Sequence, residues 1–193
     1  MKACRFVAVT LVSIARLSEA VLAGTIEGTA SPGAVVWASP TAAVEPAENG
    51  LPLTEIRNVN RSFDPALEIV PMGSSIRFSN EDPFFHSIFS TSDVDPFDLG
   101  FYSIGPGKTV SFPRSGVVRV RCHIHHTMHA SIIVVDGPAT RADARSGAFR
   151  LGGVASGTYV IHAWDLRTAT EQNAPLVYPY NAKNLSLPQP LKP

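Results

Sequence analysis

Apolar and polar residues alternate in many short runs along this chain, and glycine and proline residues separate the runs. Residues 75–80, Ser-Ile-Arg-Phe-Ser-Asn, show the pattern most clearly, and a period of two is typical of a strand with one buried face. Outside the first 23 residues no apolar stripe has a helical period. The pattern therefore predicts an all-β fold, with further strands at residues 24–29, 34–38, 66–71, 85–90, 109–112, 117–120, 131–135, 147–151 and 157–164.

Three segments lack this alternation. Residues 39–53 contain three prolines and predict a linker or long loop, and an irregular segment leads from Ser90 to Tyr102. Beyond Pro175 the chain carries four further prolines and no periodicity. We expect a surface arm or a frayed end there.

The N-terminus has the pattern of an export signal. Lys2 and Arg5 precede an apolar run over residues 6–15, and Val-Leu-Ala at residues 21–23 offers a cleavage site. The apolar run is too short to span a bilayer, which argues against an uncleaved anchor. We expect residues 1–23 to be a signal peptide and the mature chain to be periplasmic or otherwise exported, without a membrane span.

Composition narrows the function classes. The net charge is zero and 17% of residues are charged, so no basic surface for nucleic acid is expected. Of the two cysteines, Cys4 lies in the predicted signal, which leaves Cys122 alone and excludes an intrachain disulfide in the mature chain. A lone thiol in an oxidising compartment is protected if it binds a metal as thiolate.

Cys122, His125 and Met128 follow one another with two residues between each pair. A tight loop can turn this thiolate, imidazole and thioether toward one point. Two His, one Cys and a weak axial Met form the ligand set of blue copper centres, and His86 is the candidate for the second histidine. The sequence therefore predicts one type 1 copper ion, whereas each residue taken alone would also suit plain core packing.

Four further histidines are not needed for this set. His123, His126 and His129 crowd the same loop, and we interpret them as solvated neighbours rather than ligands. His162 lies in a predicted strand with no metal-binding residue nearby in the sequence.

These motifs resemble the cupredoxin family, in particular plastocyanin, amicyanin and the bacterial methylamine-utilisation-like group. The resemblance covers about residues 54–136. It is carried by Cys122-x-x-His125-x-x-Met128, Asn80-x-Asp82-x-x-x-His86-x-x-Phe89-Ser90 and Asp98-Leu99-Gly100-x-Tyr102.

The resemblance implies a Greek-key β-sandwich in which His86, Cys122 and His125 are equatorial copper ligands and Met128 is axial. Two positions depart from it: Ser87 stands where many members have asparagine, and His126 stands where amicyanin has proline. A weaker contact at Ser87 would tune the potential or the rigidity of the loop rather than abolish binding.

The remaining segments resemble the carboxypeptidase regulatory-like, or transthyretin-like, β-sandwich. The matching residues are Asp143-x-x-x-Gly147-x-Phe149-x-Leu151 and Gly157-x-Tyr159, and residues 24–28 and 34–36 resemble its opening strands. One hypothesis is that residues before and after the cupredoxin segment pair into a small second sandwich, because neither piece alone could bury a core. The expected domains are 24–48 and 138–182 for this sandwich, 51–137 for the cupredoxin domain and 183–193 for a Pro-rich tail.

The sequence thus favours an electron carrier rather than an enzyme, with a redox partner protein of unknown identity. His125 is the expected exit for electrons, and Phe84, Phe85 or Ile124 could form an apolar docking rim. The alternatives are a periplasmic copper carrier without redox cycling, a β-sandwich binding module without metal, and a small copper oxidase.

Overall fold

The computed structural model describes residues 24–46, 51, 53–155, 157–168, 170–180, 185–187 and 190–191. Strands make up its regular structure, which confirms the all-β prediction. The predicted signal peptide, residues 1–23, lies outside the described residues. Among the residues that are described, no helix has the length and apolar character to cross a membrane.

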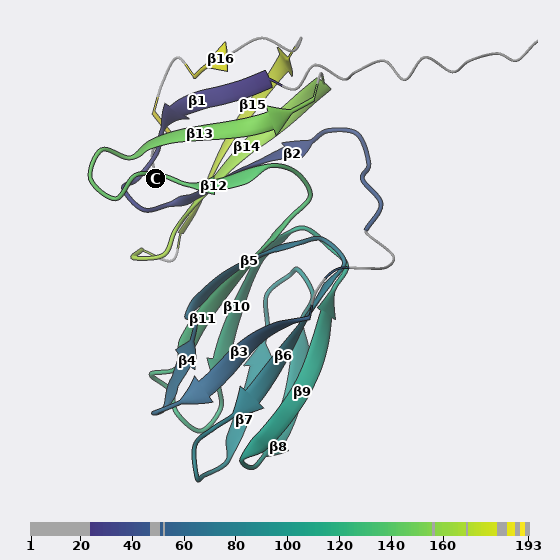
Figure 1. The fold of residues 1–193 in the computed structure, drawn as a ribbon, viewed down its shortest axis with the longest axis vertical. Helices are drawn as coiled ribbons and strands as arrows, with labels where there is room; N and C mark the ends of the chain where they lie inside the picture. Colours follow the sequence, from purple (N-terminus) through teal and green to yellow (C-terminus); the bar gives the residue numbers. More distant parts are fainter. Residues whose placement is uncertain are drawn as a thin grey trace, which may run out of the picture.

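The strands form two β-sandwiches, seen in Figure 1 as an upper and a lower lobe. The lower one has a five-stranded sheet in the order β5-β11-β10-β7-β8 facing a four-stranded sheet in the order β4-β3-β6-β9. Its strands are β3 (Thr54–Val59), β4 (Ser62–Asp64), β5 (Leu67–Pro71), β6 (Ser74–Asn80), β7 (His86–Ser90), β8 (Phe97–Tyr102), β9 (Gly105–Phe112), β10 (Gly116–Cys122) and β11 (His129–Val135).

Alternation explains the core of this first sandwich. In β6, Ile76 and Phe78 are fully buried between the sheets while Ser75 and Arg77 are only partly buried, as the period of two predicts. Cys122 and Met128 belong to the same buried cluster. Two of the candidate metal ligands therefore form part of the core.

The second sandwich consists of a three-stranded sheet, β13-β1-β16, and a four-stranded sheet, β12-β2-β14-β15. Strand β1 pairs with β13, and β2 pairs with β12 and β14, so segments on either side of the first sandwich build one core. The strands are β1 (Gly24–Thr29), β2 (Val35–Pro40), β12 (Ala139–Arg141), β13 (Ala148–Val154), β14 (Gly157–Asp165), β15 (Thr170–Tyr180) and β16 (Leu185–Ser186).

A third apolar cluster joins the two sandwiches. Trp37 and Trp164 of the second sandwich pack with Leu67, Ile133 and Val135 of the first. The guanidinium of Arg119 lies 5.0 Å from the ring centre of Trp164. Burial of two tryptophans gives this interface the character of a core, so we expect the lobes to move as one body.

Asp136, between β11 and β12, adds a polar link between the sandwiches. Its carboxylate accepts hydrogen bonds from Ser39 Oγ at 2.6 Å and Ser115 Oγ at 3.0 Å. Ser39 belongs to β2 and Ser115 precedes β10, so the Asp136 side chain connects both lobes where the chain passes from β11 to β12.

Two predictions from the sequence were wrong. The segment expected to be irregular contains β8, which pairs with β7 at the sheet edge. The region beyond Pro175 is not simply an arm: β15 continues to Tyr180, β16 pairs in parallel with β1, and Leu191 is buried. Prolines are tolerated on edge strands, and β15 is an edge strand.

Candidate metal centre

The centre lies at the end of the first sandwich where β10 passes into β11. Arg121 and His129 are the last paired residues of these two strands, and the loop between them carries Cys122, His125 and Met128. The backbone N–H of Met128 donates to the carbonyl of His125 at 2.9 Å, which closes the loop tightly. The other end of β11 leads to the second sandwich, so the loop and that sandwich lie at opposite ends of the strand.

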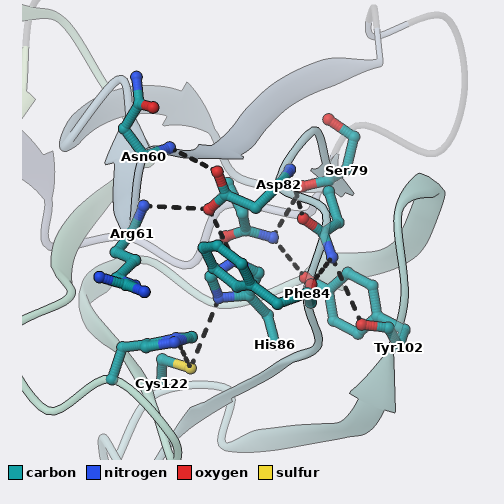
Figure 2. Close-up of polar contacts among 11 residues, drawn as sticks. Asn60, Arg61, Ser79, Asp82, Phe84, His86, Tyr102 and Cys122 are labelled. Carbon is teal, nitrogen blue, oxygen red and sulfur yellow. Dashed lines mark hydrogen bonds and ion pairs between the residues drawn. The ribbon is translucent and has the colours of Figure 1, made fainter.

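His86 comes from the neighbouring strand. Strand β7 pairs with β10 so that Ile88 lies opposite Cys122, and His86, two residues before Ile88, points to the same face. The His86 side chain is fully buried, Cys122 is 3% exposed and His125 is partly exposed. Figure 2 shows His86 directed at the sulfur of Cys122.

The three donors converge on one point. Nδ1 of His86 and Nδ1 of His125 each lie 3.8 Å from Cys122 Sγ, and the three ligand atoms all lie within 4.8 Å of one another. Metal–nitrogen and metal–thiolate bonds of about 2.1 and 2.3 Å, meeting at about 120°, would put the two donors about 3.8 Å apart. The spacing therefore fits a shared metal ion in a trigonal plane, and this soft donor set suits copper.

In the sequence, Met128 stands where a fourth ligand is expected. Its side chain is 1% exposed and lies in the same apolar cluster as Cys122. The chemistry of the thioether suits a weak axial bond to copper. Its role as a ligand stays a prediction.

Asp82 contacts the ring nitrogen of His86 that does not approach Cys122. His86 Nε2 lies 2.9 Å from Asp82 Oδ2, and the same carboxylate accepts the backbone N–H groups of Asn60 at 2.7 Å and Arg61 at 3.0 Å. Burial raises the pKa of Asp82, but the hydrogen bonds from Arg61, His86 and Asn60 outweigh it, so the pKa lies below its usual value.

The ring of Phe84 packs against both histidines. The rings of His86 and His125 have centres 4.8 Å apart, and Phe84 lies 5.5 Å from the first and 5.3 Å from the second. The guanidinium of Arg61 lies 5.0 Å from the centre of the Phe84 ring. Burial, followed by the charges of His86 and Arg61, lowers the pKa of His125, which favours the neutral ring that binds metal.

A second layer of hydrogen bonds holds this end of the sandwich together. Asn80 Oδ1 accepts the backbone N–H of Asp82 at 2.9 Å, and Asn80 Nδ2 donates to the carbonyl of Phe84 at 2.8 Å. Asn58 Nδ2 donates to Tyr102 Oη at 2.7 Å, and burial raises the pKa of Tyr102 well above its usual value. The contacts of Asn80 fix the segment that leads into His86, and Figure 2 shows Asp82, Phe84 and Tyr102 around it.

The backbone makes the contact between the two ligand segments. The carbonyl of Ser87 accepts the N–H of His123 at 2.9 Å. The residue after His86 is thus tied to the residue after Cys122 without an asparagine side chain.

The other loop histidines stand outside the cluster. His123 stacks on Phe89 with ring centres 3.8 Å apart, and its Nε2 lies 3.2 Å from Asp98 Oδ2. His126 and His129 are exposed. Among the histidine, cysteine and carboxylate groups of the described residues, His86, Cys122 and His125 form the cluster that could hold a metal ion.

Sequence reasoning did not assign roles to Asp82, Asn60 or Arg61. Asp82 was part of the motif that carried the cupredoxin resemblance, and an acid four residues before His86 was the available signal. The backbone N–H groups of Asn60 and Arg61 belong to a turn that lies more than 20 residues earlier in the chain than Asp82. Only the pairing of β3 with β6 brings that turn to the site.

Comparison with known proteins gives partial matches. No protein-family model and no curated protein matches the chain. A copper-containing nitrite reductase from Thermus scotoductus SA-01 is 26% identical over 51% of this chain, with a TM-score of 0.42. The match spans only 25% of the nitrite reductase.

Amicyanin structures also match half of the chain. A reduced variant of amicyanin is 14% identical over 51% of this chain and 98% of its own length, with a TM-score of 0.41. A Cu(I) form of another variant is 15% identical over 52% of this chain and 98% of its own length, with the same TM-score.

Proposed function

We propose that the chain is an exported type 1 copper protein that carries single electrons, with one copper held by His86, Cys122, His125 and Met128. The observation that carries the proposal is the convergence of one cysteine sulfur and two imidazole nitrogens, which all lie within 4.8 Å of one another. Copper bound there would supply the Cu(I)/Cu(II) couple.

Rigidity of the ligands suits electron transfer. His86 and Cys122 are held by adjacent strands and by core packing, and the Ser87–His123 hydrogen bond fixes the two ligand segments to each other. Ligands that keep their places in both oxidation states require little rearrangement when an electron moves. If Met128 joins His86, Cys122 and His125, four protein groups would hold the copper and leave no position for a substrate, so we expect no catalytic turnover.

The partly exposed edge of the site is His125, which we propose as the exit for electrons. Exposed apolar side chains come from the segments that border the ligands: Phe85 is 58% exposed and Ile124 is 39% exposed. Two more exposed apolar residues are Phe101, in the strand β8 that pairs with β7, and Ile104, which follows β8. Such residues suit brief, weak docking of a redox partner protein.

The first test is a visible absorption spectrum of the mature protein after one equivalent of Cu(II) is added. We expect an intense blue thiolate-to-copper band that a mild reductant bleaches reversibly. Cys122→Ala should abolish the band, whereas the matched loop variant His123→Ala should keep it, because His123 faces Asp98 and Phe89.

Other outcomes would favour the alternatives. Tight copper binding without the band, weakened by His126→Ala or His129→Ala, would support a copper carrier that does not cycle. No binding at all would contradict the proposal and leave a β-sandwich binding module.

A further inference from the structure

The carboxylate of Asp82 is buried beside His86 and contacts three nitrogen atoms. Its Oδ1 accepts the N–H of Asn60, and its Oδ2 contacts both the N–H of Arg61 and Nε2 of His86. The Asp82 side chain is 6% exposed and that of His86 is fully buried. We propose that Asp82 is a positioning residue that fixes the tautomer and orientation of His86 and lowers the reduction potential of the copper.

The direction of the hydrogen bonds supports this assignment. Backbone N–H groups can only donate, so both carboxylate oxygens already act as acceptors. The contact of 2.9 Å to His86 then places the proton on Nε2. Nδ1, which lies 3.8 Å from Cys122 Sγ, is left with its lone pair directed at the metal position. Figure 2 shows this line from the turn through Asp82 and His86 to Cys122.

The turn that binds Asp82 is itself specialised. Asn60 and Arg61 are the two central residues between β3 and β4, and their φ angles are 52° and 55°. Few residues other than glycine adopt positive φ, and two in succession are found in tight hairpin turns. This geometry directs both amides at the same carboxylate. Because the donors are backbone groups of a hairpin, they hold the carboxylate more firmly than side chains would.

A fixed negative charge behind a neutral imidazole affects both the ring and a metal bound to it. It increases the basicity of the ring, and it favours the more positive oxidation state, which lowers the reduction potential. It also restrains the ring from turning away when the ion is reduced. The inference rests on the proposed copper function for the potential, but the tautomer of His86 is a property of the metal-free protein.

The chain contains a matched control. His123 and Asp98 form a similar pair, with Nε2 and Oδ2 3.2 Å apart, but their side chains are 46% and 60% exposed and lie outside the ligand cluster. Asp98→Asn therefore removes a carboxylate next to a histidine without touching the copper ligands.

The experiment compares wild type, Asp82→Asn and Asp98→Asn. Nitrogen NMR of the metal-free proteins, at a pH where His86 is neutral, should show the proton on Nε2 of His86 in wild type and in Asp98→Asn. In Asp82→Asn the amide cannot accept from all three donors, so a share of the Nδ1–H tautomer should appear. Wild-type protein with the proton on Nδ1 would overturn the inference even if Asp82→Asn fails to fold.

The copper-loaded proteins give the second readout. Asp82→Asn should have a higher reduction potential and about 10- to 100-fold weaker copper binding, the range usual for such contacts. Asp98→Asn should match wild type in both, and Asp82→Glu should recover part of the lost affinity. An unchanged potential in folded Asp82→Asn would contradict the inference. If wild type binds no copper, the proposed function fails, while the tautomer experiment still decides the role of Asp82.

Discussion

The two sandwiches share an architecture but differ in what their cores contain. The second sandwich has a core of aliphatic and aromatic side chains, among them Val36, Phe149 and Ile161. The first sandwich has an equally apolar middle, but at one end its core includes Cys122 and Met128, with buried His86 close by. The difference is that Asn58, Asn80, Asp82 and His86, four buried polar side chains, gather at one end of the first sandwich.

Burial of polar groups is tolerated at that end because nearly every one has a partner. Asp82 has three donors, Asn80 contacts two backbone groups, and Asn58 donates to Tyr102. A buried group left without a partner costs about 1–3 kcal/mol, so a site of this kind needs its second layer. The opposite end of the sandwich packs tryptophans against the second lobe. One end is thus organised for chemistry and the other for stability.

The largest expected effect comes from the chemical end. Cys122→Ala should remove the blue absorption completely, while the free energy of unfolding of the metal-free protein changes by about 1 kcal/mol or less, since a small buried side chain is replaced by a smaller one. Titration with Cu(II) and urea denaturation measure the two quantities. Metal-free unfolding weakened by several kcal/mol would show that Cys122 is a structural residue first.

The packed end should respond in the opposite way. Trp164→Ala should lower the free energy of unfolding by about 3–5 kcal/mol because it removes a fully buried indole from the interface. The absorption of the folded, copper-loaded variant should stay as in wild type. Leu166→Ala, at an exposed position in the same lobe, is the control and should change stability by about 0.5 kcal/mol or less. An altered copper spectrum in Trp164→Ala would mean that the two ends are coupled.

Acid should weaken the second sandwich through Asp165. A hydrogen bond from the Arg167 side chain lowers the pKa of this buried carboxylate, although burial acts in the opposite direction. A pKa lowered in the folded state adds stability above the unfolded value of about 3.9, and this contribution is lost as the pH falls toward the folded pKa. Asp165→Asn should therefore show a smaller loss of stability between neutral pH and pH of about 3. An identical pH dependence of the melting temperature in both proteins would contradict this assignment.

The smallest effect is expected for Arg61→Gly. Glycine adopts positive φ without strain, and Asn-Gly is a favoured hairpin turn, so the fold should be unchanged or more stable by up to about 1 kcal/mol. Loss of the guanidinium removes one of the charges that lower the pKa of His125. The pKa of His125 in the metal-free protein should therefore rise slightly, as proton NMR titration can show. A fall in that pKa would mean that the Arg61 charge does not act on His125.

Much of this fold could be predicted because the strands of the first sandwich alternate clearly. The candidate ligands Cys122, His125 and Met128 could be proposed because they are close in sequence, and the structure brings Cys122 and His125 together with His86. By contrast, β8 contains Asp98 and Gly100, which weaken a strand pattern, and its place at a sheet edge leaves it with pairing on one side. The short parallel pairing of β16 with β1 has no local signal at all. The contacts of Asp82 depend on a distant turn, so only the tertiary structure reveals them.

The resemblance of the second sandwich to the carboxypeptidase regulatory-like fold stays a prediction. Its strand pairing, however, has a consequence for the order in which the two lobes can fold. Strands β1 and β2 precede the first sandwich in the chain, yet their partners β12, β13 and β14 follow only after the whole of it. The first sandwich is continuous in sequence and can close while β1 and β2 still lack partners. Once folded, it holds its two ends close together and shortens the loop that the second sandwich must close. The lobe that would bind the metal therefore also serves as the template on which its neighbour assembles.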